Sequence, residues 1–94
     1  MVYLIHFNAK LTGHARHYIG WTWDEKSLPR RIHHHRIGQG ARIMAVVAER
    51  GIGFDVVRTW PEGDKFHERK LKNQKHAARL CPVCNPTGAL RRAA

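Results

Sequence analysis

Val2-Tyr3-Leu4-Ile5-His6-Phe7 and Arg16-His17-Tyr18-Ile19-Gly20-Trp21-Thr22 are the two stretches that decide the fold. Both are rich in aromatic and β-branched residues, which favour strands. Residues 8–15 between them contain Asn, Thr and Gly and indicate a loop. We therefore expect an antiparallel hairpin with a long loop. Because side chains alternate along a strand, Tyr18 and Gly20 should share one face of the second strand.

The rest of the chain predicts helices around one further strand. A helix should open near Asp24, with Pro29 tolerated in its first turn, and should end before Gly38-Gln39-Gly40. We then expect a helix at 41–50, a strand at 54–60 and a basic helix at 65–80. This ββααβα order predicts an α+β fold, in which a small three-stranded antiparallel sheet is flanked by helices. We expect one domain over residues 1–85 and a flexible tail at 86–94.

Charge points to a polyanionic partner. The 94 residues hold 17 Lys and Arg against 7 Asp and Glu, for a formal net charge of +10. Phosphates attract such a surface whatever their sequence, so nucleic acid is the leading partner. The longest apolar run, Ile43 to Ala48, is too short to span a membrane. Two cysteines without a secretory signal favour a reducing, cytoplasmic location.

The acidic residues limit the chemistry that the chain can perform. A two-metal nuclease needs several carboxylates converging on two ions. The seven acidic residues are scattered along the chain, and no DxD pair or HExxH motif is present. We therefore expect any metal chemistry to use a single carboxylate.

A set of short motifs lies in order on successive predicted elements. The motif residues are Val2-Tyr3, Tyr18-Ile19-Gly20, Leu28, Arg31, His35 and Glu68. In this order they resemble the motifs of the GIY-YIG nuclease domain, over residues 2–80 and as far as Asn85 if the family's final Asn is included. Met1 stands where the family usually has Gly, and the loop between the two tyrosines is longer than usual.

The resemblance implies a metal-dependent endonuclease that hydrolyses DNA phosphodiester bonds. Tyr3 would act as the base toward water, which requires nearby cations to depress its pKa. Tyr18 and His35 would assist, and Arg31 would hold the phosphate with its planar guanidinium. Glu68 would bind one Mg²⁺ or Mn²⁺ ion, which retains several waters in its shell.

Each of these residues also has a purely structural interpretation. Without a catalytic role, the two tyrosines would be ordinary strand residues with half-buried rings. Arg31 and His35 would then be a solvated and a packed helix residue. Glu68 would pair with Lys72 four residues later on the same helix.

The remaining basic residues form the expected nucleic-acid-binding surface. The candidates are Arg30, Arg36, Arg42, Lys65, Arg69, Lys72 and Lys75. Trp21 and Trp23 either stack on an unpaired base or pack against the protein. The substrate would be DNA, with branched or damaged DNA among the candidates, and a homodimer or a partner protein would supply specificity. The alternative from another class is a non-catalytic nucleic-acid-binding module on the same basic surface, with or without zinc at the CxxC motif.

Cys81-Pro82-Val83-Cys84 supplies two of the four ligands of a zinc site. His67 and His76 could complete a Cys₂His₂ set, although their spacing is not that of a zinc finger. We expect two thiols in a turn rather than a zinc site. The sequence leaves both interpretations open.

Overall fold

The computed structural model describes residues 1–10 and 16–85. Its elements are β1 (Val2–Phe7), β2 (His17–Trp21), a 3₁₀ turn (Glu25–Ser27), α1 (Leu28–Arg36), α2 (Arg42–Glu49), β3 (Phe54–Trp60), α3 (Lys65–Gln74) and α4 (Ala77–Leu80). The expected tail at 86–94 and part of the expected loop lie outside the described residues. Within the described part of the chain, no helix is long and apolar enough to cross a membrane.

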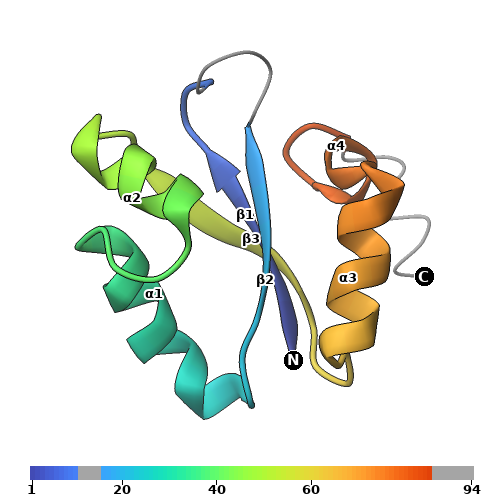
Figure 1. Ribbon diagram of the computed structural model, residues 1–94. Coiled ribbons are helices and arrows are strands. Elements are labelled where there is room, and N and C mark those ends of the chain that lie inside the picture. Colours follow the sequence, from blue (N-terminus) through green and yellow to red (C-terminus); the bar gives the residue numbers. More distant parts are fainter. Residues whose placement is uncertain (11–15, 86–94) are drawn as a thin grey trace.

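The three strands form one antiparallel sheet in the order β2-β1-β3. Helices α1 and α2 cover one face of the sheet, and α3 and α4 cover the other (Figure 1). Central strand β1 is buried along its whole length. The expected architecture, a three-stranded antiparallel sheet flanked by helices, is confirmed.

Alternation along β1 divides the core into two clusters. Tyr3, Ile5 and Phe7 pack with Met44 and Val47 of α2. Val2 and Leu4 point to the opposite face, and the residues packed there are Ile19, Leu71, Leu80 and Cys81. Each fully buried aliphatic or aromatic side chain contributes about 1.5–3 kcal/mol to stability. Successive β1 side chains therefore point alternately toward the α1–α2 layer and toward the α3–α4 layer.

Local signals explain where the helices begin. Pro29 lies in the first turn of α1, as expected, because its missing N–H has no helical partner there. The Asp64 side chain accepts a hydrogen bond from the His67 backbone N–H at 2.8 Å and caps α3. Such a cap contributes about 1 kcal/mol to helix stability.

The expectation of a single helix over 65–80 is wrong. Helix α3 ends at Gln74, and Lys75 adopts the left-handed conformation with φ of 55°. A separate short helix, α4, follows at Ala77–Leu80. The chain turns at Lys75, so the cysteine segment folds back toward the sheet instead of continuing along the axis of α3 (Figure 1).

Candidate functional site

The five residues expected to perform chemistry meet at the β2 edge of the sheet. They are Tyr3 on β1, Tyr18 on β2, Arg31 and His35 on α1, and Glu68 on α3, and we call them the tyrosine cluster. The site therefore draws on both helical layers, because α1 reaches it from one face of the sheet and α3 from the other.

Hydrogen bonds organise the cluster around the Tyr3 hydroxyl. This oxygen lies 2.8 Å from His35 Nε2 and accepts a hydrogen bond from Arg31 Nε at 3.3 Å. The Tyr18 ring lies edge-on to His35, with 5.4 Å between the ring centres. The guanidinium of Arg31 also interacts with the Tyr18 hydroxyl. Arg31 is thus held beside both phenols.

Burial controls protonation in the cluster. Burial raises the pKa of Tyr3 to about 12, although the Arg31 hydrogen bond acts in the opposite direction. Burial also raises the pKa of Tyr18. Burial and the positive charge of Arg31 lower the pKa of His35 to about 4. The expected depression of the Tyr3 pKa is therefore wrong, since desolvation outweighs the cation, and at neutral pH both groups are uncharged.

Gly20 makes room for the Tyr3 ring. The two residues are directly paired across β1 and β2. A Cβ atom on Gly20 would collide with the hydroxyl end of that ring and would lie 2.7 Å from Tyr3 Cε2. The glycine of the Tyr18-Ile19-Gly20 motif therefore lets the phenol lie flat across the neighbouring strand, where its hydroxyl reaches α1.

Gly40 lies against the back of the cluster, and its backbone conformation is what favours glycine there. It adopts φ of 95°, and a Cβ atom there would lie 3.5 Å from His35 Nδ1 and 3.7 Å from the Arg31 guanidinium. His35 Nδ1 is buried and has no hydrogen-bond partner among the described residues. The turn after α1 thus lies directly against the two helix residues of the site.

Glu68 reaches the cluster from α3. Its carboxylate raises the pKa of both tyrosines, because its negative charge opposes ionisation of each phenol. It also pairs with Lys72 at 3.8 Å, and the Lys72 ammonium lies 5.1 Å from the centre of the Tyr18 ring. The structural pairing considered for Glu68 is present, and it coexists with a position beside the phenols.

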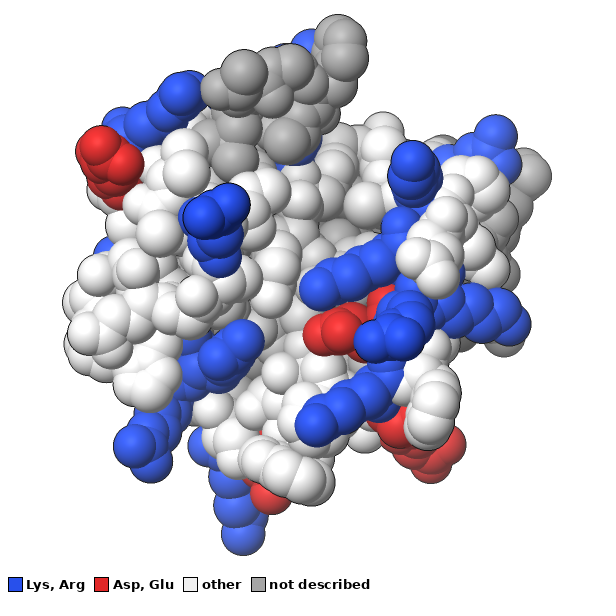
Figure 2. Space-filling view, viewed as in Figure 1, with Lys and Arg blue, Asp and Glu red and all other residues white. Residues whose placement is uncertain are grey.

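Basic side chains surround an acidic patch on the face beside α3 (Figure 2). Lys72 and Lys75 line a hollow of about 210 Å³ next to Tyr18. Lys65 lines a second hollow of about 280 Å³ with Trp21, Thr22, Trp23 and Arg31. Trp21 is half-buried and Trp23 is 77% exposed, with the Lys65 ammonium over both rings.

The other expected nucleic-acid-binding residues are distributed more widely. The guanidinium of Arg36 stacks over the Phe54 ring at 4.6 Å, on the α2 side of the sheet. Arg30, Arg42 and Arg69 are exposed. Another hollow, of about 580 Å³ between Trp60 and His67, contains none of the tyrosine cluster.

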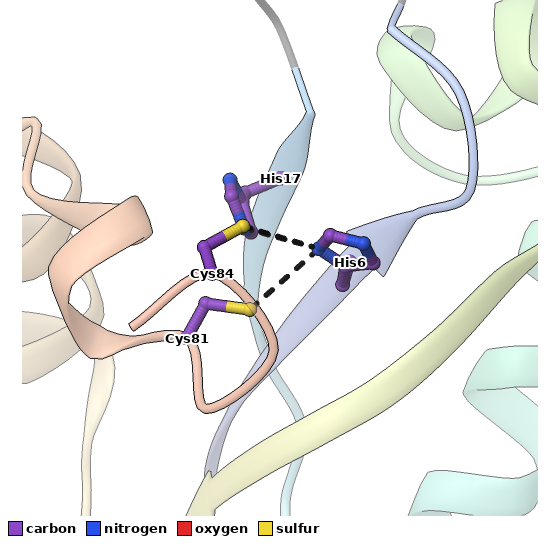
Figure 3. Close-up of side chains that lie close together, drawn as sticks. All are labelled: His6, His17, Cys81 and Cys84. Atoms are coloured by element: carbon purple, nitrogen blue, oxygen red, sulfur yellow. Dashed lines mark hydrogen bonds between the residues drawn. The ribbon is translucent and has the colours of Figure 1, made fainter. Parts of the chain in front are cut away.

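A second cluster lies at the other end of the β1–β2 ladder. His6 of β1, His17 of β2, Cys81 and Cys84 point toward one another, and we call them the His/Cys cluster (Figure 3). Their ligand atoms all lie within 4.8 Å of one another. The cluster could bind a metal ion, and imidazole and thiolate donors suit zinc better than magnesium.

Sequence reasoning missed the two histidines of this cluster. His67 packs against the Trp60 ring instead, and the cluster contains neither His67 nor His76. His6 and His17 lie directly opposite each other in the hairpin. One sequence signal could have identified them. Each strand of the predicted hairpin carries a histidine near its loop end, where the two can pair across the strands.

Comparisons with known proteins give no relative for this chain. No family model, no curated protein and no solved structure matches it. The case for a function therefore rests on the residues and their geometry.

Proposed function

We propose that the protein is a metal-dependent endonuclease of the GIY-YIG type that hydrolyses DNA phosphodiester bonds. The observation that carries the proposal is the meeting of the tyrosine cluster's five side chains from four separate elements. The cluster combines groups that exchange protons, a guanidinium and a carboxylate. Phosphodiester hydrolysis needs these functions together, to activate water and to stabilise the charge that develops.

Arg31 binds the scissile phosphate in this proposal. Its guanidinium is always charged and offers a planar fork that matches phosphate oxygens. It is half-buried and donates to the Tyr3 hydroxyl, so its charge already lies beside both phenols. Lys72, whose ammonium lies over Tyr18, adds positive charge at the same place.

Water activation runs through a proton relay rather than through a preformed phenolate. The water gives its proton to the Tyr3 oxygen while Tyr3 passes its own proton to His35 Nε2, 2.8 Å away. His35 accepts because it is neutral in the free protein, and the bound phosphate stabilises the imidazolium that forms. Tyr3 is fully buried, so Arg31 uncovers its hydroxyl when the guanidinium turns to the phosphate.

Glu68 is the residue that would hold Mg²⁺ or Mn²⁺. Its side chain is 23% exposed, and its ion pair with Lys72 is long at 3.8 Å. A single accessible carboxylate fits Mg²⁺, which binds through one or two carboxylates and keeps several waters. The bound ion would polarise the phosphate and stabilise the departing oxygen.

The substrate surface extends from Arg31 across the hollow lined by Trp21, Trp23 and Lys65. An exposed indole beside two cations suits a base stacked above a bound backbone. This arrangement favours DNA with an unpaired base, such as a branch or a damaged site. A homodimer or a partner protein would supply any further specificity.

The alternative is a non-catalytic nucleic-acid-binding module. The complete burial of Tyr3 and its pKa of about 12 are the observations that favour it. Such a module would use the same lysines and tryptophans without cleaving the strand. It predicts salt-dependent DNA binding that survives loss of Glu68.

The decisive experiment is nicking of supercoiled plasmid DNA with Mg²⁺ and Mn²⁺. Arg31→Ala and Glu68→Gln should each reduce the cleavage rate by about 10²–10³-fold, as when a group that stabilises transition-state charge is removed. Arg50→Ala and Glu49→Gln, which change the same charges near the end of α2, should cleave at the wild-type rate.

Three results would contradict the nuclease proposal. One is wild-type activity that persists in EDTA, and another is a fully active Arg31→Ala or Glu68→Gln variant. The third is tight DNA binding with no cleavage under either metal, which would establish the binding module instead. DNA affinity is therefore measured by fluorescence anisotropy on the same samples at two salt concentrations.

A further inference from the structure

The His/Cys cluster joins segments that are distant in the sequence. His6 lies on β1 and His17 opposite it on β2, while Cys81 and Cys84 follow α4. The sheet and the cysteine segment therefore bring four side chains with nitrogen or sulfur donors to one point (Figure 3). The tyrosine cluster uses none of them.

Hydrogen bonding alone does not account for this arrangement. His6 Nδ1 has three neighbours at once: His17 Nε2 at 3.3 Å, Cys81 Sγ at 3.6 Å and Cys84 Sγ at 3.7 Å. A ring nitrogen carries either one N–H or one lone pair, so it can satisfy one of the three. A cation at the centre would satisfy all of them.

Four separations between donor atoms match a tetrahedral zinc site. Zn–S and Zn–N bonds of about 2.3 and 2.0 Å place a sulfur and a nitrogen ligand about 3.5 Å apart and two nitrogens about 3.3 Å apart. Three nitrogen–sulfur distances are 3.5, 3.6 and 3.7 Å, and the nitrogen–nitrogen distance is 3.3 Å. The two other separations, from Cys81 to His17 and between the two sulfurs, lie within 4.8 Å. These distances fit ligands that share one ion.

Contacts that involve no metal already shape the cysteine turn. The Asn85 backbone N–H donates to the Cys81 carbonyl at 2.8 Å, and its side-chain amide donates to the Arg79 carbonyl at 3.2 Å. Arg58 of β3 donates to the Leu80 carbonyl at 3.2 Å. Cys81 itself is fully buried in the core cluster on the α3 side. The turn is therefore held in place against the sheet.

We infer that His6, His17, Cys81 and Cys84 bind one structural Zn²⁺ ion that ties the end of the α3–α4 segment to the β1–β2 hairpin. Four protein ligands leave no open position, which is typical of structural zinc. Below about 100 residues a single core gives modest stability, and such a cross-link compensates for it. The zinc site does not depend on the proposed nuclease activity.

Metal content is the first test. The chain is purified without a metal-affinity step, so that nickel from a column does not enter the His/Cys cluster, and zinc is measured by mass spectrometry. We expect about one zinc per chain after expression with added zinc. Cobalt substitution should give visible bands of tetrahedral Co²⁺ and a thiolate charge-transfer band. Less than about 0.1 zinc per chain would overturn the inference.

Variants assign the ligands. Cys84→Ser and His17→Gln change an exposed and a half-buried residue and should each lower zinc content by about 10-fold or more. His76→Gln, an exposed histidine directly before α4, is the matched control and should retain the metal. Wild-type zinc content in either ligand variant, or equal loss in His76→Gln, would reject this ligand set. Circular dichroism checks that each variant is folded.

Selective chelation tests whether zinc stabilises the fold. A zinc chelator that ignores Mg²⁺ should lower Tm by more than about 10 °C and restore thiol reactivity toward Ellman's reagent, and added zinc should reverse both effects. Omitting Mg²⁺ should leave Tm unchanged. An unchanged Tm after zinc removal, or thiols that stay unreactive because they form a disulfide, would overturn the inference. These measurements do not use cleavage, so failure of the nuclease proposal would be seen separately.

Discussion

The tyrosine cluster and the His/Cys cluster occupy opposite ends of the same two strands and opposite faces of β2. Tyr18 and His17 are neighbours in the chain, and each contributes to a different cluster. One cluster holds phenols, a guanidinium and a carboxylate, which suit phosphate and hard cations. The other holds imidazoles and thiols, which suit zinc. Neighbouring strand residues can therefore serve chemistry on one side and cross-linking on the other.

The largest expected effect is that of Gly20→Ala, which should disturb the tyrosine cluster and spare the His/Cys cluster. Gly20→Ala places a methyl group against the Tyr3 ring and should destabilise the fold by about 3 kcal/mol, the upper end for overpacking. It should abolish cleavage and leave zinc content unchanged. Urea unfolding and zinc analysis measure the two effects.

Gly51→Ala is the control for the first prediction. A Cβ atom on Gly51 meets nothing within 4 Å, but its φ is 66°. It should cost only about 1 kcal/mol, from the left-handed backbone. Equal losses at Gly20 and Gly51 would show that Tyr3 does not need the space over Gly20.

A smaller effect concerns pH and comes from His35 in the tyrosine cluster. The folded His35 has a pKa of about 4, below the unfolded value of 6.5, so the unfolded chain binds more protons between these values. Stability should therefore fall as pH drops from 6.5 to 4, with His35 contributing about 2–3 kcal/mol of the loss. His35→Gln should flatten this slope in denaturant titrations.

His33→Gln on the exposed side of α1 is the matched control for the pH experiment and should keep the wild-type slope. Identical slopes for the wild type and His35→Gln would mean that burial of the neutral imidazole does not govern acid stability. Both variants keep His6 and His17, so any contribution from the second cluster cancels.

The smallest expected effect concerns the surface beside the tyrosine cluster. Trp23→Ala should weaken binding to single-stranded or branched DNA by about 1 kcal/mol, near fivefold, because it removes an exposed stacking platform. Val83→Ala, which trims another exposed apolar side chain, beside the His/Cys cluster, should leave DNA affinity unchanged. An equal effect of both substitutions would remove the reason for placing the strand near Arg31.

Sequence patterns predicted the strands and the tyrosine cluster well. Strands 2–7 and 54–60 have the expected bounds, because their β-branched and aromatic residues face helices on both sides of the sheet. The tyrosine cluster assembles because its motif residues lie at ordered positions on successive elements. The sign of the Tyr3 pKa shift was wrong, since the degree of burial depends on packing that no local pattern reveals.

The break in the last helix and the second cluster were harder to predict. Lys75 takes a left-handed conformation without glycine, so no breaker marks the end of α3. The pairing of His6 with His17 depends on the register of a hairpin whose long loop leaves the register open. The end of α3 and the His/Cys cluster therefore depend on tertiary packing and strand register, which local propensity does not predict.

The pairing of β1 with β2 also has a consequence for how the chain selects its own alignment while folding. A slip of one residue in β2 would turn every side chain to the opposite face. Tyr3 fits across the strand only over Gly20, and His6 meets its partner imidazole only opposite His17. The hairpin thus has a register-dependent contact at each end of its ladder. A chain paired in the wrong register would lose both contacts at once.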